Sequence, residues 1–195
     1  MAKLHPGALI QRAAHGLFAN CVLLLRARRE KIVGARVVLL VGSGGNGGDT
    51  LWAGARLAAR GASVTAFTLA DRWHTEAAAA LVHSGGRLRR ADALGKLETV
   101  ANADLILDGI VGIGGKGALR SPVAELVTAA VASNALVVAV DLPSGIDADT
   151  GAVADPAAVV TADVTVTFGC LELFNTSRTN PSLKCFTYWA PDGFK

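Results

Sequence analysis

Short apolar runs alternate along the chain with longer segments in which apolar residues recur at helical spacing. The runs of strand length are residues 36–41, 63–69, 105–107, 136–140 and 164–168. The segments with helical spacing are residues 6–29, 49–60, 77–82, 93–102 and 122–134. Strands that are mostly apolar are typical of a parallel sheet covered on both faces. The pattern predicts an α/β fold, a Rossmann-like three-layer α/β/α sandwich with a mostly parallel sheet.

Residues with known preferences for helix ends mark two of these helices. Asp71 is predicted to cap the helix through residues 77–82, and the glycine pair that begins at Gly85 is predicted to end it. Ser121 is predicted to cap the last helix, with Pro122 at its first position. These signals support the alternation of strands and helices.

Length and composition favour one globular domain over residues 1–195, because the chain has 195 residues, of which 51% are hydrophobic and 18% charged. The net charge of +3 is mild. No aromatic residues interrupt the basic stretches 26–31 and 87–90, which are interpreted as solvated surface, and no nucleic-acid partner is expected. The apolar run 126–140 is too short to span a bilayer. Three cysteines without metal-ligand spacing indicate a reducing compartment, and we expect the cytoplasm.

The last segment of the chain does not continue the pattern. Residues 170–195 have no sustained helical or strand period and are rich in turn formers, such as Asn180 and Pro181. Their aromatic residues are too apolar for a fully solvated linker. We therefore expect one short strand near residues 184–189, with a poorly packed segment before it.

Polar residues follow three of the predicted strands directly. Asn46 and Asp49 lie in and after the loop that follows residue 41, Asp108 follows residue 107, and Asp141 and Ser144 follow residue 140. Parallel doubly wound sheets bind ligands beyond the carboxyl ends of their strands. A single aspartate at a strand end is equally well a helix cap or a turn former. Three such loops at one edge predict a functional site there.

Several familiar chemistries fit these loops poorly. Gly42, Gly44 and Gly47 match G-x-G-x-x-G, but Asp49 is predicted to start the following helix, where its charge would repel a diphosphate. This disfavours an ordinary nucleotide-dependent oxidoreductase. No Gly-Lys-Ser/Thr follows, which excludes a Walker A loop. No histidine lies in the three loops and Pro143-Ser144-Gly145 is not a nucleophile elbow, which disfavours a serine hydrolase.

The three loops together resemble one known family. Residues 44–49, G-G-N-G-G-D, resemble the N-N-G-G-D loop of the NAD(P)H-hydrate epimerase family, the YjeF amino-terminal domain. Residues 107–114, L-D-G-I-V-G-I-G, resemble its V-D-A-x-x-G-x-G segment, and residues 140–151 resemble its D-x-P-S-G-x-D-x-D-x-G segment. The order and spacing also agree. This chain departs from the family at Gly45, which replaces an asparagine, at Thr50, which replaces a glycine, and in the atypical tail 170–195.

The resemblance implies a function in metabolite repair. Members interconvert the R and S epimers of hydrated NADH and NADPH, so that a separate dehydratase can use the S epimer. The implied substrate-binding residues are Gly45, Asn46, Gly47, Gly48, Asp49, Gly112, Ile113, Gly114, Gly115, Lys116, Gly117, Ala118 and Asp141. The implied ligands of a potassium ion are Asn46, Asp108 and Ser144, whose amide, carboxylate and hydroxyl oxygens suit a hard cation. A homodimer is compatible with the sequence.

The implied reaction needs a group that moves a proton to or from the substrate hydroxyl. Asp141 is the first candidate for this catalytic role and Asp108 is preferentially a metal ligand, although the two roles can be exchanged. A non-catalytic binding or scaffold module of the same family is the alternative. The retained Asn46, Asp49 and Ser144, together with both aspartates, argue against it.

Overall fold

The computed structural model describes residues 6–112, 117–168 and 184–188. Its seven strands form one sheet in the order β3-β2-β1-β4-β5-β6-β7, in which every neighbouring pair is parallel. The strands are β1 (Arg36–Val41), β2 (Ser63–Thr68), β3 (Arg87–Arg90), β4 (Leu105–Gly109), β5 (Leu136–Val140), β6 (Val164–Phe168) and β7 (Lys184–Tyr188). The predicted parallel α/β sheet is thereby confirmed.

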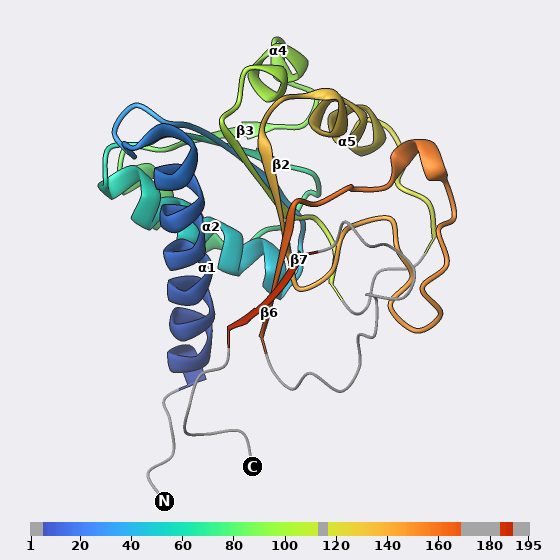
Figure 1. The fold of residues 1–195 in the computed structure, drawn as a ribbon, viewed down its shortest axis with the longest axis horizontal. Helices are drawn as coiled ribbons and strands as arrows, with labels where there is room; N and C mark the ends of the chain where they lie inside the picture. The colour runs from blue at the N-terminus through green and yellow to red at the C-terminus, as the bar shows by residue number, and fades with distance from the viewer. Residues whose placement is uncertain (1–5, 113–116, 169–183, 189–195) are drawn as a thin grey trace, which may run out of the picture.

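Helices cover both faces of this sheet (Figure 1). They are α1 (Pro6–Arg29), α2 (Gly45–Ala59), α3 (Thr75–His83), α4 (Lys96–Ala101), α5 (Val123–Ala132) and the short 3₁₀ helix η1 (Pro156–Ala158). The first three pack on one face, and α4, α5 and η1 lie on the other. The predicted three-layer sandwich is confirmed. No helix in the described part of the chain is long and apolar enough to cross a membrane.

Alternation along the strands divides the core into two layers, because successive side chains of a strand point to opposite faces. In β1, Leu39 packs with the layer of α1, α2 and α3, and Leu40 packs with the layer of α4 and α5. Both leucines are fully buried. At roughly 1.5–3 kcal/mol for each large apolar side chain removed from water, such strands are the main source of stability.

The order in which the strands are added to the sheet reverses between β1 and β4. From β1 the chain adds β2 and β3 on one side, and then returns to add β4 on the other. The connections after β1 and β4 therefore leave the sheet in opposite directions, which opens a crevice beyond the carboxyl ends of these strands. The Gly42 N–H donates to the Gly109 carbonyl at 3.0 Å and joins the two connections at this point.

Helix α2 begins four residues earlier than the sequence predicts. It starts at Gly45, so Asp49 lies in the second turn, and the first turn has no acidic residue. Glycine disfavours a helix in isolation. A tertiary contact offsets that preference here, because Gly47 packs directly against the backbone of Gly42. Within the helix, the Thr50 hydroxyl donates to the Asn46 carbonyl at 2.7 Å.

Two features around the third helix also differ from prediction. The N-cap of α3 is His74, whose Nδ1 accepts from the Ala77 N–H at 3.2 Å, and not Asp71. Asp71 is exposed and lies 3.5 Å from Arg90 in an ion pair. The basic stretch predicted as solvated surface is the edge strand β3, although its arginines are exposed as expected.

The helices on the other face begin later than predicted. Helix α4 starts at Lys96, after Gly95 in the left-handed conformation. Helix α5 starts at Val123, so Pro122 occupies the N-cap position predicted for Ser121 and makes no side-chain cap bond.

The short strand predicted near the end of the chain is confirmed as β7, which pairs with β6. The segment predicted to be poorly packed, residues 170–183, lies outside the described residues. The extent of the domain over residues 1–195 stays a prediction.

Candidate functional site

Three glycines allow the connections after β1 and β4 to meet in direct backbone contact. A Cβ atom on Gly42 would lie 1.8 Å from the Ile110 carbonyl oxygen, and one on Gly47 would lie 2.2 Å from the Gly42 carbonyl oxygen. A Cβ on Gly109 would lie 2.0 Å from the hydroxyl oxygen of Thr50, which is fully buried. Because Gly109 has no side chain, it leaves space for Thr50, the residue that departs from the family loop.

Asp108 and Ser144 join the second and third loops inside the protein. Ser144 donates to the Asp108 carboxylate twice, from its N–H at 2.8 Å and from its Oγ at 2.7 Å. The Ile110 N–H also donates to this carboxylate at 3.3 Å. Both side chains have no exposed surface.

The Asp108 carboxylate has no positively charged partner among the described residues. No ion pair to this carboxylate occurs in the part of the chain that the structure describes. Burial raises its pKa to about 6, although the hydrogen bonds from Ser144 and Ile110 act in the opposite direction. A carboxylate without counter-charge in this position is costly to ionise.

Asn46 connects the first loop to the other two. Its side-chain Nδ2 donates to the Val140 carbonyl at 2.9 Å and lies 3.3 Å from the Val111 carbonyl. It also hydrogen-bonds the Asp141 carboxylate, which acts to lower the pKa of that group. One amide therefore contacts the ends of β4 and β5 at the same time.

Asp141 has an unusual backbone conformation at the end of β5. Its φ is +73°, and the Leu142 N–H donates across it to the Val140 carbonyl at 2.9 Å. This is a γ-turn of the rare, strained kind. The Asp141 N–H donates to Val166 of β6 at 2.8 Å and holds the turn in place. Strained residues of this kind concentrate at functional sites.

Asp49 forms a pair of like charges with Asp141. Burial and then the charge of Asp141 raise the pKa of Asp49 to about 7. Its Oδ1 is buried and has no hydrogen-bond partner in the described structure. Burial also raises the pKa of Asp141. Two neighbouring carboxyl groups whose ionisation is opposed are able to hold one proton near neutral pH.

This pairing was not predicted from sequence. Asp49 and Asp141 follow different strands, so no spacing along the chain indicates the pair. Placing the helix start at Asp49 also concealed that Asn46 and Asp49 lie on the same side of α2.

The predicted glycine-rich substrate loop is only partly described. Gly112 packs against Asn46, because a Cβ at Gly112 would lie 2.6 Å from the amide nitrogen. Gly117 has a φ of +82°, and both Gly117 and Ala118 are exposed. The remaining residues predicted for this loop lie outside the described residues: Ile113, Gly114, Gly115 and Lys116.

The start of α2 presents backbone N–H groups to the same crevice. Gly44 is the N-cap and supplies no side-chain cap, so the amides of Gly45, Asn46 and Gly47 have no partner within the helix. Helix N-termini of this kind attract anions such as phosphate. Asp49 lies one turn further on, so the prediction that it starts the helix at that position is wrong.

The acidic residues further along the third loop have a different role. The Asp147 Oδ1 accepts from the N–H groups of Asp149 and Thr150 and from the Thr150 hydroxyl, at 2.8–3.1 Å. The Gly151 N–H donates to the Asp147 carbonyl at 2.8 Å. Asp147 thus shapes its own turn.

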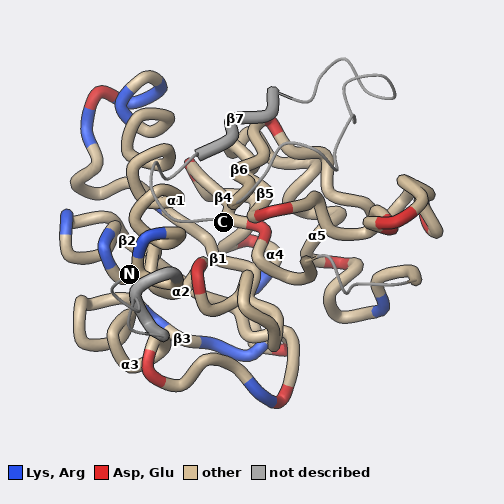
Figure 2. The backbone as a smooth tube through the Cα atoms, turned by 90° about the horizontal axis from the view of Figure 1, so that it is seen from below, with Lys and Arg blue, Asp and Glu red and all other residues tan. Residues whose placement is uncertain are grey.

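Acidic backbone positions lie near the labels β1, β4 and β5 in Figure 2, whereas basic positions lie further out around β2 and β3.

Together the geometry brings the sequence-predicted polar residues of all three loops to one crevice: Asn46, Asp49, Asp108, Asp141 and Ser144. Within the described ranges, no group of three His, Cys, Asp or Glu side chains is arranged to hold a metal ion. The mixed amide, hydroxyl and carboxylate set is different in kind from such a group. A Rossmann-like domain with a polar site at its switch point has the architecture found in many nucleotide-binding α/β proteins.

The chain belongs to the YjeF-related protein N-terminus family, whose model matches residues 6–173. It is 49% identical over 174 residues to the bifunctional NAD(P)H-hydrate repair enzyme Nnr of Mycobacterium tuberculosis, covering 88% of this chain and 35% of that protein. It is 41% identical over 177 residues to the NAD(P)H-hydrate epimerase of Clavibacter sepedonicus, covering 85% of this chain and 73% of that protein. The chain spans about a third of the length of the Nnr relatives.

The crystal structure of yeast ynu0 has the same fold. It superposes with a TM-score of 0.79 at 22% identity, over 95% of this chain and 79% of that chain.

Proposed function

We propose that this protein is an NAD(P)H-hydrate epimerase, which interconverts the R and S epimers of hydrated NADH or NADPH. Relatives that share 41–49% of its residues bear the names of this epimerase or of the bifunctional repair enzyme. The observation that carries the proposal is the convergence of the three polar loops beside the N-terminus of α2, where Asn46 hydrogen-bonds Val140 and Ser144 hydrogen-bonds the buried Asp108. It puts groups that can move a proton next to amides that can bind a phosphate.

The reaction as proposed needs no net oxidation or reduction. The nicotinamide ring nitrogen donates electrons while the hydroxyl leaves as water, which gives a conjugated iminium, and water then adds back from either face. Ring opening and closure is the alternative route to the same epimers. Loss of the hydroxyl requires a proton donor, and addition of water requires a proton acceptor.

Asp141 is proposed as the group that exchanges this proton. The γ-turn fixes its backbone, and Asn46 fixes its carboxylate. The charge of Asp141 adds to the effect of burial in raising the pKa of Asp49, so ionisation of both carboxyl groups at once is opposed. Residues 45–49 at the start of α2 and residues 112–118 after β4 are proposed to bind the nucleotide, as the family resemblance implies. Gly45 has open space beside it, whereas Gly47 packs against Gly42 and would contribute through its backbone N–H.

A potassium ion is proposed at Asn46, Asp108 and Ser144. The fit rests on Asp108, a fully buried carboxylate to which no described residue supplies a positive charge. Carbonyl oxygens of Val111 and Val140 lie beside Asn46 and add oxygens suited to a hard cation. The bound ion would supply the missing counter-charge and join the three loops. Asp108 then serves to hold the site together, while Asp141 exchanges the proton.

The proposed partner reaction is a dehydration specific for the S epimer. The bifunctional relatives are named as repair enzymes, and this chain corresponds to about a third of their length. A separate dehydratase acting on the S epimer stays a proposal that rests on the family resemblance. A cytoplasmic location is consistent with the buried, free thiol of Cys21, whose pKa burial raises to about 12. A homodimer stays a proposal.

A coupled assay tests the function. Purified R-NADHX is incubated with an S-specific dehydratase, and NADH recovery is followed with and without this protein. The proposal predicts faster recovery with the protein and none of this acceleration with Asp141→Asn. Equal recovery with and without the folded protein would contradict the epimerase and favour a binding module.

A further inference from the structure

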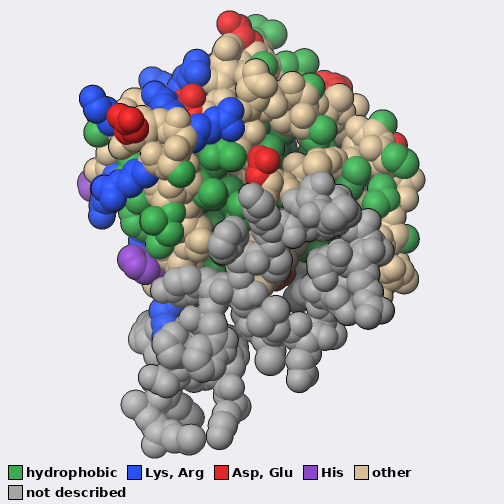
Figure 3. All heavy atoms as spheres, viewed as in Figure 1, with side chains coloured by type: hydrophobic (Ala, Val, Ile, Leu, Met, Phe, Trp, Pro, Cys, Tyr) green, Lys and Arg blue, Asp and Glu red, His purple; other side chains and the backbone are tan. Residues whose placement is uncertain are grey.

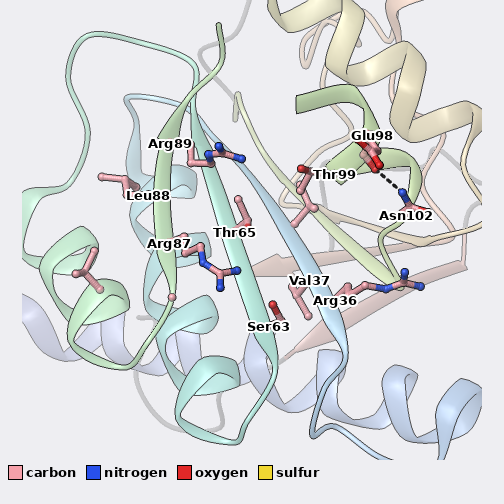
Figure 4. A pocket seen from close by; sticks show the side chains of 13 residues that line it. Arg36, Val37, Ser63, Thr65, Arg87, Leu88, Arg89, Glu98, Thr99 and Asn102 are labelled. Atoms are coloured by element: carbon pink, nitrogen blue, oxygen red, sulfur yellow. Dashed lines mark hydrogen bonds between the residues drawn. The ribbon is translucent and has the colours of Figure 1, made fainter. Parts of the chain in front are cut away.

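On the face of the sheet that carries α4 and α5, no described helix covers the strands β2 and β3 at the edge of the sheet. The chain crosses from β3 to β4 through α4, which has only six residues. This helix packs against α5 and leaves the outer face of β2 and β3 open (Figure 4). A pocket of about 820 Å³ lies there, within the usual size range for small-molecule sites. Its lining contains none of the residues of the candidate epimerase site.

The strand pattern makes this open face polar and basic. Arg87 and Arg89 of β3 both extend across β2 in Figure 4, whereas Leu88 between them points the other way. Leu88 packs against the core on the opposite face. On β2, Ser63 and Thr65 lie on the pocket side. The alternation of β3 therefore presents two guanidinium groups to one pocket, with their Cα atoms roughly 6–7 Å apart.

Neither arginine is neutralised by the protein. Among residues 6–112, 117–168 and 184–188, no carboxylate forms an ion pair with Arg87 or Arg89. Neighbouring arginines differ: Arg36 pairs with Asp104, and Arg90 with Asp71 and Asp92. Lys and Arg side chains gather on the side of the molecule where β3 lies (Figure 3, upper left).

The floor of the pocket carries a polar side chain. Thr65 is only 8% exposed and lines the pocket between the two walls. The opposite wall is formed by Glu98 and Thr99 of α4 and by Asn102, the residue that follows this helix. In Figure 4 these side chains face the pocket from the side opposite the arginines. The Glu98 carboxylate makes that wall unfavourable for a second anionic group, whereas Thr99 is able to bond neutral hydroxyls.

We infer that this pocket binds a small phosphate ester that carries hydroxyl groups, such as a sugar phosphate. The phosphate lies between Arg87 and Arg89, since guanidinium groups match its oxygens in paired hydrogen bonds. Thr65 bonds the phosphate from the floor. The hydroxyl-bearing part of the ligand faces Thr99 and Asn102. None of the described residues that line the pocket is aromatic, so they offer no stacking surface for a base.

Calorimetric titration of the intact protein with ribose 5-phosphate tests the inference, with ribose and inorganic phosphate as comparison ligands. We expect saturable binding of ribose 5-phosphate, weaker binding of phosphate and none of ribose. The double variant Arg87→Ala/Arg89→Ala should bind at least about tenfold more weakly. Arg90→Ala, which removes a paired arginine from the same strand, is the matched control and should bind like the wild type.

A second variant and a second readout keep the outcome interpretable. Thr65→Val retains the charge and shape of the floor and should weaken binding severalfold even if the double variant is less stable. Hydrogen exchange should slow in β2 and β3 when ribose 5-phosphate is added. Absence of binding at millimolar ligand, or equal affinity in the wild type and the double variant, would overturn the proposal. Protection confined to α2 and the loop after β5 would also overturn it, because the ligand would then occupy the crevice. None of these measurements depends on epimerase activity.

Discussion

Asp141 combines a strained backbone with the proton-exchange role proposed for it. A positive φ is tolerated by few residues, and asparagine is the one that also keeps the size of aspartate. Asp141→Asn should therefore fold normally and lower epimerisation at least about a hundredfold, as expected on loss of an acid/base group. The coupled assay measures the rate, and circular dichroism checks the fold. Near-wild-type turnover would remove Asp141 from the mechanism.

Asp49 is expected to oppose folding at high pH. Its folded pKa of about 7 lies above the ordinary value of 3.8. The folded state thus holds the proton more tightly, and the favourable contribution of the neutral form is full below about pH 4 and lost as the pH rises through 7. Asp49→Asn should raise the free energy of unfolding at pH 8 by about 1–2 kcal/mol, after allowance for solvent screening, with little change at pH 4.

Urea unfolding at the two pH values measures this difference. Asp155→Asn offers a comparison, because Asp155 is half-buried and uses its carboxylate to cap η1. Asparagine caps a helix about as well as aspartate, so that variant should change the free energy of unfolding little at either pH. A loss of stability in Asp49→Asn at pH 8 would show that its carboxylate has a favourable partner.

At the scale of elements, the contact between the first two loops depends on glycine. Gly42→Ala would place a Cβ 1.8 Å from a backbone oxygen, whereas Gly44→Ala meets nothing within 4 Å, and the φ of Gly44 is −89°. We expect Gly42→Ala to destabilise the protein by about 3 kcal/mol or more, and Gly44→Ala by less than about 0.5 kcal/mol. Thermal or urea unfolding of both variants checks the contrast. Similar stability in the two would mean that the loops are able to move apart.

Elements with strong periodicity were predictable from sequence, and those governed by tertiary contact were not. The bounds of α1, β1, β5 and β6 agree with prediction because each is a sustained apolar pattern. The early start of α2 was missed because its glycines are helical only against the neighbouring loop. The strand β3 was missed because three of its four residues are arginines, which are uncommon in a buried strand but suit an exposed edge.

The residues of the candidate site were predictable to a similar degree. Polar residues at strand ends indicated the edge, and the parallel topology places them together. Three relations required coordinates: the γ-turn at Asp141, the Asp49–Asp141 pair and the Asn46 contacts with two strand ends. Each joins residues that are close in space but distant in sequence, or depends on one backbone angle, and no spacing rule describes them.

At the scale of the whole molecule, a cation would join the loops of three separate strands. Crystals grown with rubidium or thallium should show a difference peak among Asn46, Asp108 and Ser144. Potassium should also raise the unfolding temperature relative to a matched concentration of tetramethylammonium, since a ligand that binds only the folded state stabilises it. An ordered site without a peak would contradict the proposal.

The C-terminal part of the chain offers a further prediction. Strand β7 extends the sheet beyond β6, whereas the sequence of residues 170–181 has no sustained period. We expect rapid hydrogen exchange across residues 170–181 and slower exchange in β7 of the intact protein. Slow exchange throughout residues 170–181 would show that this segment is well folded.

The order of strands in the sheet has a consequence for synthesis on the ribosome. Strand β1 is made first, β2 and β3 are added to one side of it in turn, and β4 to β7 are then added to the other side in turn. Each new strand therefore finds its hydrogen-bonding neighbour already made, and none has to wait for a later one. Domains are able to fold as they emerge from the ribosome. The loops after β1, β4 and β5 can thus assemble around their crevice before β7 has been translated.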